Sequence, residues 1–154
     1  MSIVPPVGPE GEEVDYEIEK EVWNIYELVD GTKLRVRSIL MKLVKSKTPE
    51  HDGTHQFGGG FQNLVDVKAN PRMKGPPSTR EYAPDELNKL PRTEVNFSPI
   101  IEDWNVYRLP GGDRIKVKLV VATVFRVKDR FNLFGDPLYL VNSQNVITGI
   151  PKTE

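Results

Sequence analysis

The chain has no cysteine, only two histidines and no long apolar run. Without cysteine it can form neither a disulfide nor a cysteine-ligated zinc site, and it cannot use a thiol as a nucleophile. Its apolar runs, such as residues 119–122, are far shorter than the roughly 20 residues of a membrane-spanning helix. The acidic N-terminal region also lacks the basic and apolar segments of a signal peptide. We therefore expect a cytoplasmic protein that does not enter a membrane.

The sequence also lacks the local motifs of the common enzyme and cofactor-binding classes. It has no Walker loop, no GxGxxG fingerprint, no nucleophile elbow, no HExxH segment and no zinc-type ligand spacing. The corresponding loops of the chain bring together neither a serine–histidine–acid set nor a pair of carboxylates. A catalytic set therefore cannot be assembled from them. The interpretation leans towards a protein that is not an enzyme, and we expect no cofactor.

Charge is low overall but unevenly spread. The 154 residues carry a net charge of −1, yet residues 10–21 hold seven acidic residues and one lysine, which leaves +5 for the rest of the chain. A dedicated nucleic-acid-binding domain is usually strongly basic, so a near-neutral chain disfavours that class. The acidic segment could instead cover a basic surface on the same or a neighbouring subunit.

Two segments of the chain resemble each other. Residues 22–45 (VWNIYELVDGTKLRVRSILMKLVK) align with residues 103–126 (DWNVYRLPGGDRIKVKLVVATVFR) at an offset of 81. The identical positions in the first segment are Trp23, Asn24, Tyr26, Leu28, Gly31 and Val36. Two copies are too few for a solenoid, so this pattern predicts an internal duplication of one β unit, packed about a pseudo-twofold axis.

Each unit reads as antiparallel β-structure. Aromatic and β-branched residues precede Asp30-Gly31 or Gly111-Gly112, which can supply the positive φ angles of a tight hairpin turn. The strand after the turn alternates charged and apolar residues and then becomes apolar on both faces. Thirteen residues from 33 to 45 would span about 43 Å if straight, so we expect the strand to bend. The fold class is thus all-β, a small barrel or sandwich. The repeated Asn24 and Asn105 are expected to bind backbone groups at a bulge.

The remaining segments define the predicted boundaries. Residues 1–13 form a flexible arm, residues 14–70 the first repeat, and residues 100–154 the second repeat. Residues 71–99 form a proline-rich connector, in which residues 83–90 have the start and stop signals of a short helix with Leu87 and Leu90 facing inward. Whether the two repeats share one core stays open at this point.

Three consecutive glycines lie in the stretch HDGTHQFGGGF, residues 51–61. We align residues 57–61 with residues 134–138, so the glycines are expected to form a β-turn before the final strand of the first repeat. A phosphate-binding loop would need a helix after the glycines, and a strand is expected there instead.

Both histidines lie in the same stretch. His51, Asp52 and His55 could surround a metal ion, but Pro49 and Gly53 argue against the helix that would place both histidines on one face. The preferred interpretation is a solvated loop, with a weak metal site as the alternative.

A basic strand occurs in each repeat. Its members are Lys33, Arg35 and Arg37 in the first and Arg114, Lys116 and Lys118 in the second. If the duplication brings the two strands together, the six cations form a surface for a phosphate backbone, although a solvated sheet face is the simpler interpretation.

The leading hypothesis is a non-catalytic binding or assembly module, a subunit of a complex or a self-associating protein. Nucleic-acid binding through the basic strands is the second hypothesis. A metal-dependent protein centred on the histidine loop is the third.

Overall fold

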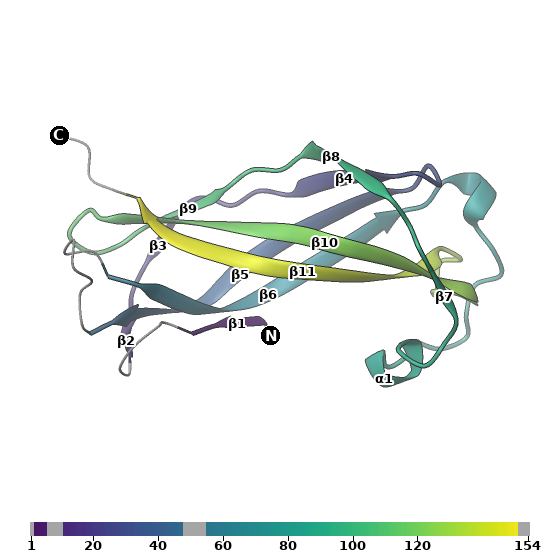
Figure 1. Ribbon diagram of the computed structural model, residues 1–154, viewed down its shortest axis with the longest axis horizontal. Coiled ribbons are helices and arrows are strands. Elements are labelled where there is room, and N and C mark those ends of the chain that lie inside the picture. The colour runs from purple at the N-terminus through teal and green to yellow at the C-terminus, as the bar shows by residue number, and fades with distance from the viewer. Residues whose placement is uncertain (1, 6–10, 48–54, 151–154) are drawn as a thin grey trace.

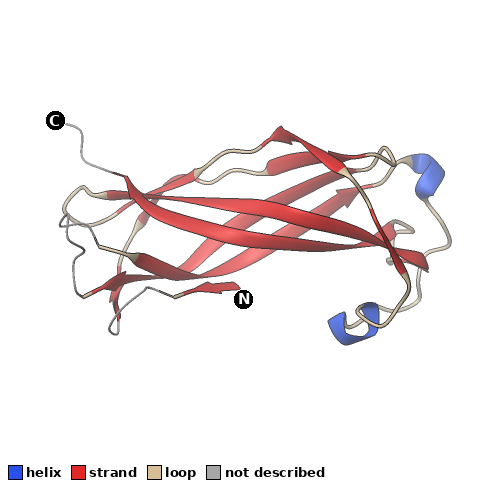
Figure 2. Cartoon of the chain, viewed as in Figure 1, coloured by secondary structure: helices blue, strands red, loops and turns tan. Residues whose placement is uncertain are grey.

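The computed structural model describes residues 2–5, 11–47 and 55–150, which form mostly β-sheet. Figure 1 shows an elongated molecule with long, twisted strands running along its length. Most of the described chain is coloured as strand in Figure 2. The strands form two antiparallel sheets, and within the described ranges these do not close into a barrel. The all-β prediction is confirmed.

The first sheet has the strand order β1-β6-β5-β4-β8, with β2 paired to the far end of β5. Its strands are β1 (Ser2–Val4), β2 (Gly11–Val14), β4 (Asn24–Leu28), β5 (Lys33–Ser46), β6 (Phe57–Lys68) and β8 (Phe97–Ile101). Two of these strands, β1 and all of β2 except Val14, lie in residues 1–13, the region expected as a flexible arm.

The second sheet has the order β11-β10-β9-β3, with β7 paired to β10. Its strands are β3 (Glu17–Lys20), β7 (Arg92–Glu94), β9 (Asn105–Arg108), β10 (Arg114–Phe131) and β11 (Pro137–Ile150). The chain passes from β3 in this sheet to β4 in the first, and from β8 in the first sheet to β9 in this one. Each sheet therefore takes an edge strand from the other half of the chain.

The two hairpins and their bulges occur at matching positions. The second turn places Gly111 and Gly112 at φ +91° and +93°, as expected, whereas in the first turn Gly31 has a φ of +88° and Asp30 does not have a positive φ. The pairing of β5 with β6 shifts register between Leu40 and Lys42, and that of β10 with β11 shifts between Val121 and Thr123. Such irregularities bend long strands, so the expected departure from a straight strand has a local cause.

The core lies between the sheets in two clusters, and both clusters draw on both halves of the chain. The first contains Tyr26, Leu28, Leu34, Val36, Val95, Leu119, Val121 and Val124. The second contains Leu40, Leu43, Phe61, Tyr107, Leu109, Ile115 and Val117. In each cluster, side chains of one hairpin pack against the long strand of the other hairpin; those of the hairpin are tyrosine, leucine, and valine or isoleucine. The two hairpins therefore share their hydrophobic core.

The connector contains one 3-10 turn, η1 (Pro71–Met73), and one short helix, α1 (Pro84–Leu87). Pro84 occupies the first turn of α1 and the Glu86 side chain accepts a hydrogen bond from the Ala83 amide, so the helix starts as its sequence indicates. Leu87 and Leu90 are half-buried. Because β7 and most of β8 also lie within residues 71–99, this segment contributes strands to both sheets.

The prediction of a β-turn at Gly58-Gly59-Gly60 is wrong. These three residues lie inside β6 and are buried. A Cβ on Gly59 would lie 2.8 Å from the Lys42 carbonyl oxygen, so the glycine is needed for close approach of β5 at its bulge. The alignment of Phe57 with Phe134 is wrong too. Phe57 pairs with Lys45, and the partner of Arg126, 81 residues after Lys45, is Tyr139.

Candidate interaction surface

The six predicted cations lie on two different sheets. Alternate residues of β5 and β10 point to opposite faces, and the apolar residues between the cations enter the clusters between the sheets. The three cations of β5 therefore face outward from the first sheet and those of β10 outward from the second. The structure does not bring the six together on one surface, and nucleic-acid binding through them stays a prediction.

Most of these cations have close partners. Arg35 pairs with Asp66 at 2.7 Å, and Arg114 pairs with Glu19 at 3.2 Å. The Arg35 guanidinium also lies 4.7 Å from the centre of the Trp23 ring, and the Lys116 ammonium lies 4.6 Å from that of Trp104. A phosphate group would have to compete with these carboxylates and rings, which lowers the gain from binding it.

Two glutamates connect the two halves of the chain. Each accepts a hydrogen bond from a tyrosine of the other half and also pairs with a cation. Glu21 accepts from the Tyr107 hydroxyl at 2.8 Å and from Arg37 at 3.0 Å. Glu102, which is 81 residues after Glu21, accepts from the Tyr26 hydroxyl at 2.6 Å and pairs with Lys118 at 3.5 Å. Each link thus joins a glutamate of one half to a tyrosine of the other.

These links shift the pKa values of the two tyrosines. The links were not predicted from the sequence. Burial, reinforced by the hydrogen bond to Glu102, raises the pKa of Tyr26, and burial with the bond to Glu21 raises that of Tyr107. Both hydroxyls therefore stay protonated and donate at neutral pH. The signal was available, because Glu21 and Glu102 extend the aligned segments by one identical residue at the same offset.

The repeated asparagines bind backbone groups, as expected, but their partners lie across the molecule. The Asn24 side-chain oxygen accepts from the Asp103 amide at 3.0 Å, and that of Asn105 accepts from the Val22 amide at 2.9 Å. The Asn105 side-chain nitrogen donates to the Ser38 carbonyl at 3.1 Å. Both asparagines are buried, so they satisfy backbone groups where the chain passes between the sheets.

The histidine loop is only partly visible. His51 and Asp52 lie outside the described residues. His55 is described, and its Nδ1 lies 2.7 Å from the Ser46 carbonyl oxygen. Since a carbonyl can only accept, this nitrogen carries the proton. Within the described ranges, no group of three or more histidine, aspartate or glutamate side chains is placed to hold a metal ion, and the metal hypothesis stays a prediction.

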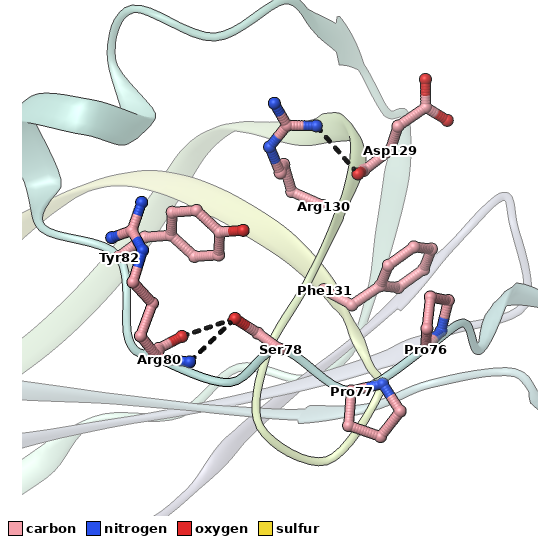
Figure 3. A pocket seen from close by; sticks show the side chains of 8 residues that line it. All are labelled: Pro76, Pro77, Ser78, Arg80, Tyr82, Asp129, Arg130 and Phe131. Atoms are coloured by element: carbon pink, nitrogen blue, oxygen red, sulfur yellow. Dashed lines mark hydrogen bonds between the residues drawn. The ribbon is translucent and has the colours of Figure 1, made fainter.

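A hollow of about 480 Å³ lies between the connector and the end of β10 (Figure 3). Its lining residues are Pro76, Pro77, Ser78, Arg80, Tyr82, Asp129, Arg130 and Phe131. Arg80 stacks on Tyr82 at 4.6 Å and forms two hydrogen bonds to Glu86, at 2.9 and 2.7 Å. The bonds from Arg80 lower the pKa of Glu86 to about 2. The lining contains one carboxylate, that of Asp129, and no histidine.

The remaining surface feature is the seam where β6 of the first sheet approaches β11 of the second, which we call the β6–β11 seam. Asn63 and Asn145 join the strands there through reciprocal side-chain hydrogen bonds of 2.9 and 3.2 Å. On one side of this pair, β1 adds to β6 opposite Gly59, Gly60 and Phe61, and Val4 packs on the second core cluster. This half of the seam is covered.

The other half of the seam is open. Val65 lies opposite Val36 on the inner face of the first sheet but is 48% exposed, whereas Val36 is 1% exposed. Ser143 lies opposite the buried Val121 on the inner face of the second sheet and is also exposed. Among the described strands, β11 pairs with β10 alone. Inward-facing side chains are therefore accessible beside an unpaired strand edge.

None of the helices in the described ranges has the length and apolar character needed to cross a membrane. Comparison with known proteins finds no matching family model, no similar curated protein and no similar solved structure.

Proposed function

We propose that this chain is a non-catalytic binding module that assembles with another protein through the β6–β11 seam, on a scaffold built from two copies of one β unit related by a pseudo-twofold axis. The carrying observation is the exposure of Val65 and Ser143, which face inward next to the free edge of β11. Inner-face positions of a sheet are normally covered, and an unpaired strand edge is a common site for adding a strand from another chain.

The internal duplication is supported by contacts that recur at an offset of 81. The pair Tyr26–Glu102 corresponds to Tyr107–Glu21 with the halves exchanged. The edge-to-face ring pairs show the same exchange, because Tyr16 packs on Tyr107 and Phe97 packs on Tyr26. Contacts of residue i in one half with residue j in the other, repeated with the halves exchanged, are what a twofold relation produces.

The pairing of the basic strands with carboxylates and tryptophans supports a scaffolding role for those residues. This pairing favours a role of the basic strands in the scaffold over binding of a phosphate backbone.

The proposal is tested by comparing the native mass of the chain in lysate of its source cell with that of the purified chain. Size-exclusion chromatography with light scattering and mass spectrometry of co-eluting species gives both values. We expect a larger species in the lysate with a companion of defined stoichiometry, whereas an oligomer of the chain alone would contradict assembly with another protein. A monomer in both samples would show that the chain does not assemble, and the proposal would fail.

A further inference from the structure

The covered half of the seam shows what the open half lacks. β1 adds to β6 with Ile3 opposite Gly60 and Val4 opposite Gly59. Gly60 of β6 pairs with Lys42, the first paired residue after the bulge of β5. Asn142 of β11 has the equivalent position, because it pairs with Thr123, the first paired residue after the bulge of β10. The stretch of β11 that matches the docking site of β1 is therefore residues 141–143, and no described strand pairs with it on the side away from β10.

The apolar surface at this position resembles the one that Val4 covers. Val4 packs on the second core cluster together with Phe57 and Ile147. Val67, Tyr139 and Val141 pack on the first cluster and are only partly buried. A side chain placed like that of Val4 would cover these residues and the exposed Val65 beside them.

The charge of the open edge restricts what can add to it. Residues 138–150 of β11 (LYLVNSQNVITGI) contain no charged side chain. Two of the other outer strands are protected, because β3 contains Glu17, Glu19 and Lys20 and β8 contains Pro99 in its middle. An uncharged segment with β-branched residues fits the edge of β11, since a charged group would lose water there without gaining a partner.

The β1 strand of a second copy of the chain is a poor source of this segment. Each chain has one N-terminal strand, and β6 of the same chain already binds it. A second copy could offer its β1 only by uncovering its own β6, which exchanges one open edge for another. A different protein can fill the edge with a net gain of strand pairing.

We infer that residues 141–143 of β11 bind an extended, uncharged segment of a partner protein, which adds antiparallel to β11 as β1 adds to β6 and places a β-branched side chain over Val141 and Val65. This inference rests on the proposed assembly function and names the chemistry of the partner segment. Main-chain hydrogen bonds to the edge supply affinity, and the apolar contact selects the side chain.

The test uses the full-length, ¹⁵N-labelled protein and a synthetic peptide of residues 1–9, MSIVPPVGP, as the probe. We expect millimolar peptide to shift the backbone amide signals of residues 139–143 and 64–67 in a saturable way. A control peptide with Ile3→Pro loses a main-chain donor within the three-residue strand and should leave these signals unchanged. Saturable shifts confined to residues 57–61 would mean that the peptide merely replaces β1, and that result would overturn the inference, as would no shift at all.

Two variants of matched chemistry locate the site. Ser143→Lys places a charge on the open inner face and should weaken peptide binding about tenfold or more, which corresponds to about 1.4 kcal/mol. Gln144→Lys places the same charge on the outer face one residue away and should leave binding unchanged, and both positions are exposed, so both variants should fold. Equal effects of the two would contradict the site. If the native companion is retained by Ser143→Lys, assembly as such stands, while the seam as its site and the inference about β11 both fall.

Discussion

At the scale of single residues, Asp30 joins the first hairpin turn to the second sheet. Its carboxylate accepts hydrogen bonds from the Tyr139 hydroxyl at 2.7 Å, from Arg126 at 2.9 Å and from the Thr32 amide at 2.9 Å. The side chain is 8% exposed. Burial works to raise the pKa of Asp30, but the bonds from Tyr139, Thr32 and Arg126 outweigh it and hold the pKa below its usual value. The folded state therefore favours the charged form.

We predict that Asp30→Asn lowers the free energy of unfolding by about 2 kcal/mol at pH 7, because hydrogen bonds to a buried charged group are lost. Since the folded pKa lies below the unfolded value near 3.8, the unfolded chain takes up the proton first as the pH falls. The contribution of Asp30 is thus full above that value and is lost as the pH falls through the folded pKa. Urea titrations from pH 7 to pH 2 should show the gap between wild type and variant shrinking towards zero.

A matched control removes an exposed carboxylate. Asp66 pairs with Arg35 on the outer face and is 48% exposed, so Asp66→Asn should cost less than about 1 kcal/mol. A loss at pH 7 as large as that of Asp30→Asn would show that the number of charges, and not the buried network, sets the effect.

At the scale of elements, the two hairpin turns both end on a glycine with a positive φ angle but differ in the surroundings of that glycine. Gly31 and Gly112 have φ angles of +88° and +93°. A Cβ on Gly31 would lie 2.6 Å from the Asn70 side-chain nitrogen, whereas no atom of the described residues lies within 4 Å of a Cβ on Gly112. Asn70 donates to the Asp30 carbonyl at 3.0 Å and so fixes the segment after β6 against the first turn. The first turn is packed and the second is open.

We predict that Gly112→Ala lowers the free energy of unfolding by about 1–2 kcal/mol, because alanine is strained at positive φ. Gly31→Ala should lower it by about 1 kcal/mol more, since Asn70 must also move and lose its hydrogen bond. Thermal unfolding of the two variants measures the difference, expected at about 2–4 °C for a chain of this size. Equal melting temperatures would mean that Asn70 adapts without cost.

At the scale of the whole molecule, the sequence predicted elements better than their placement. Composition and turn residues were enough for the strands of the two hairpins, the glycine of the Asp30-Gly31 turn and the helix at Pro84, because these depend on neighbouring residues. The glycines of β6 were wrongly predicted to form a turn, because glycine is required there by the close approach of the Lys42 carbonyl from another strand.

The candidate site was out of reach of the sequence for the same kind of reason. Nothing local marks Val65 or Ser143 as accessible, since both follow the ordinary alternation of a strand. Their exposure depends on which edge β1 covers, and this is decided by the pairing of residues 2–4 with residues 59–61. The basic strands stood out in the sequence, yet sheet packing places them on opposite faces.

The shared clusters lead to a prediction for the two halves. Tyr26 and Leu34 of the first half pack with Leu119 and Val124 of the second, and Leu40 packs with residues of the second hairpin in the other cluster. A piece containing residues 1–88 or 89–154 alone would expose half of both clusters to water. We expect each piece, expressed separately, to give narrow amide signals in its NMR spectrum and little β-type circular dichroism, because neither can bury its apolar face. Mixing the two should restore the native spectrum.

The control is a cut in the intact protein, at a protease site inserted between Asn88 and Lys89, which are both exposed. The two pieces should then stay together in size-exclusion chromatography. A dispersed spectrum from either piece alone would show that one half folds independently, and the cores would then not require each other.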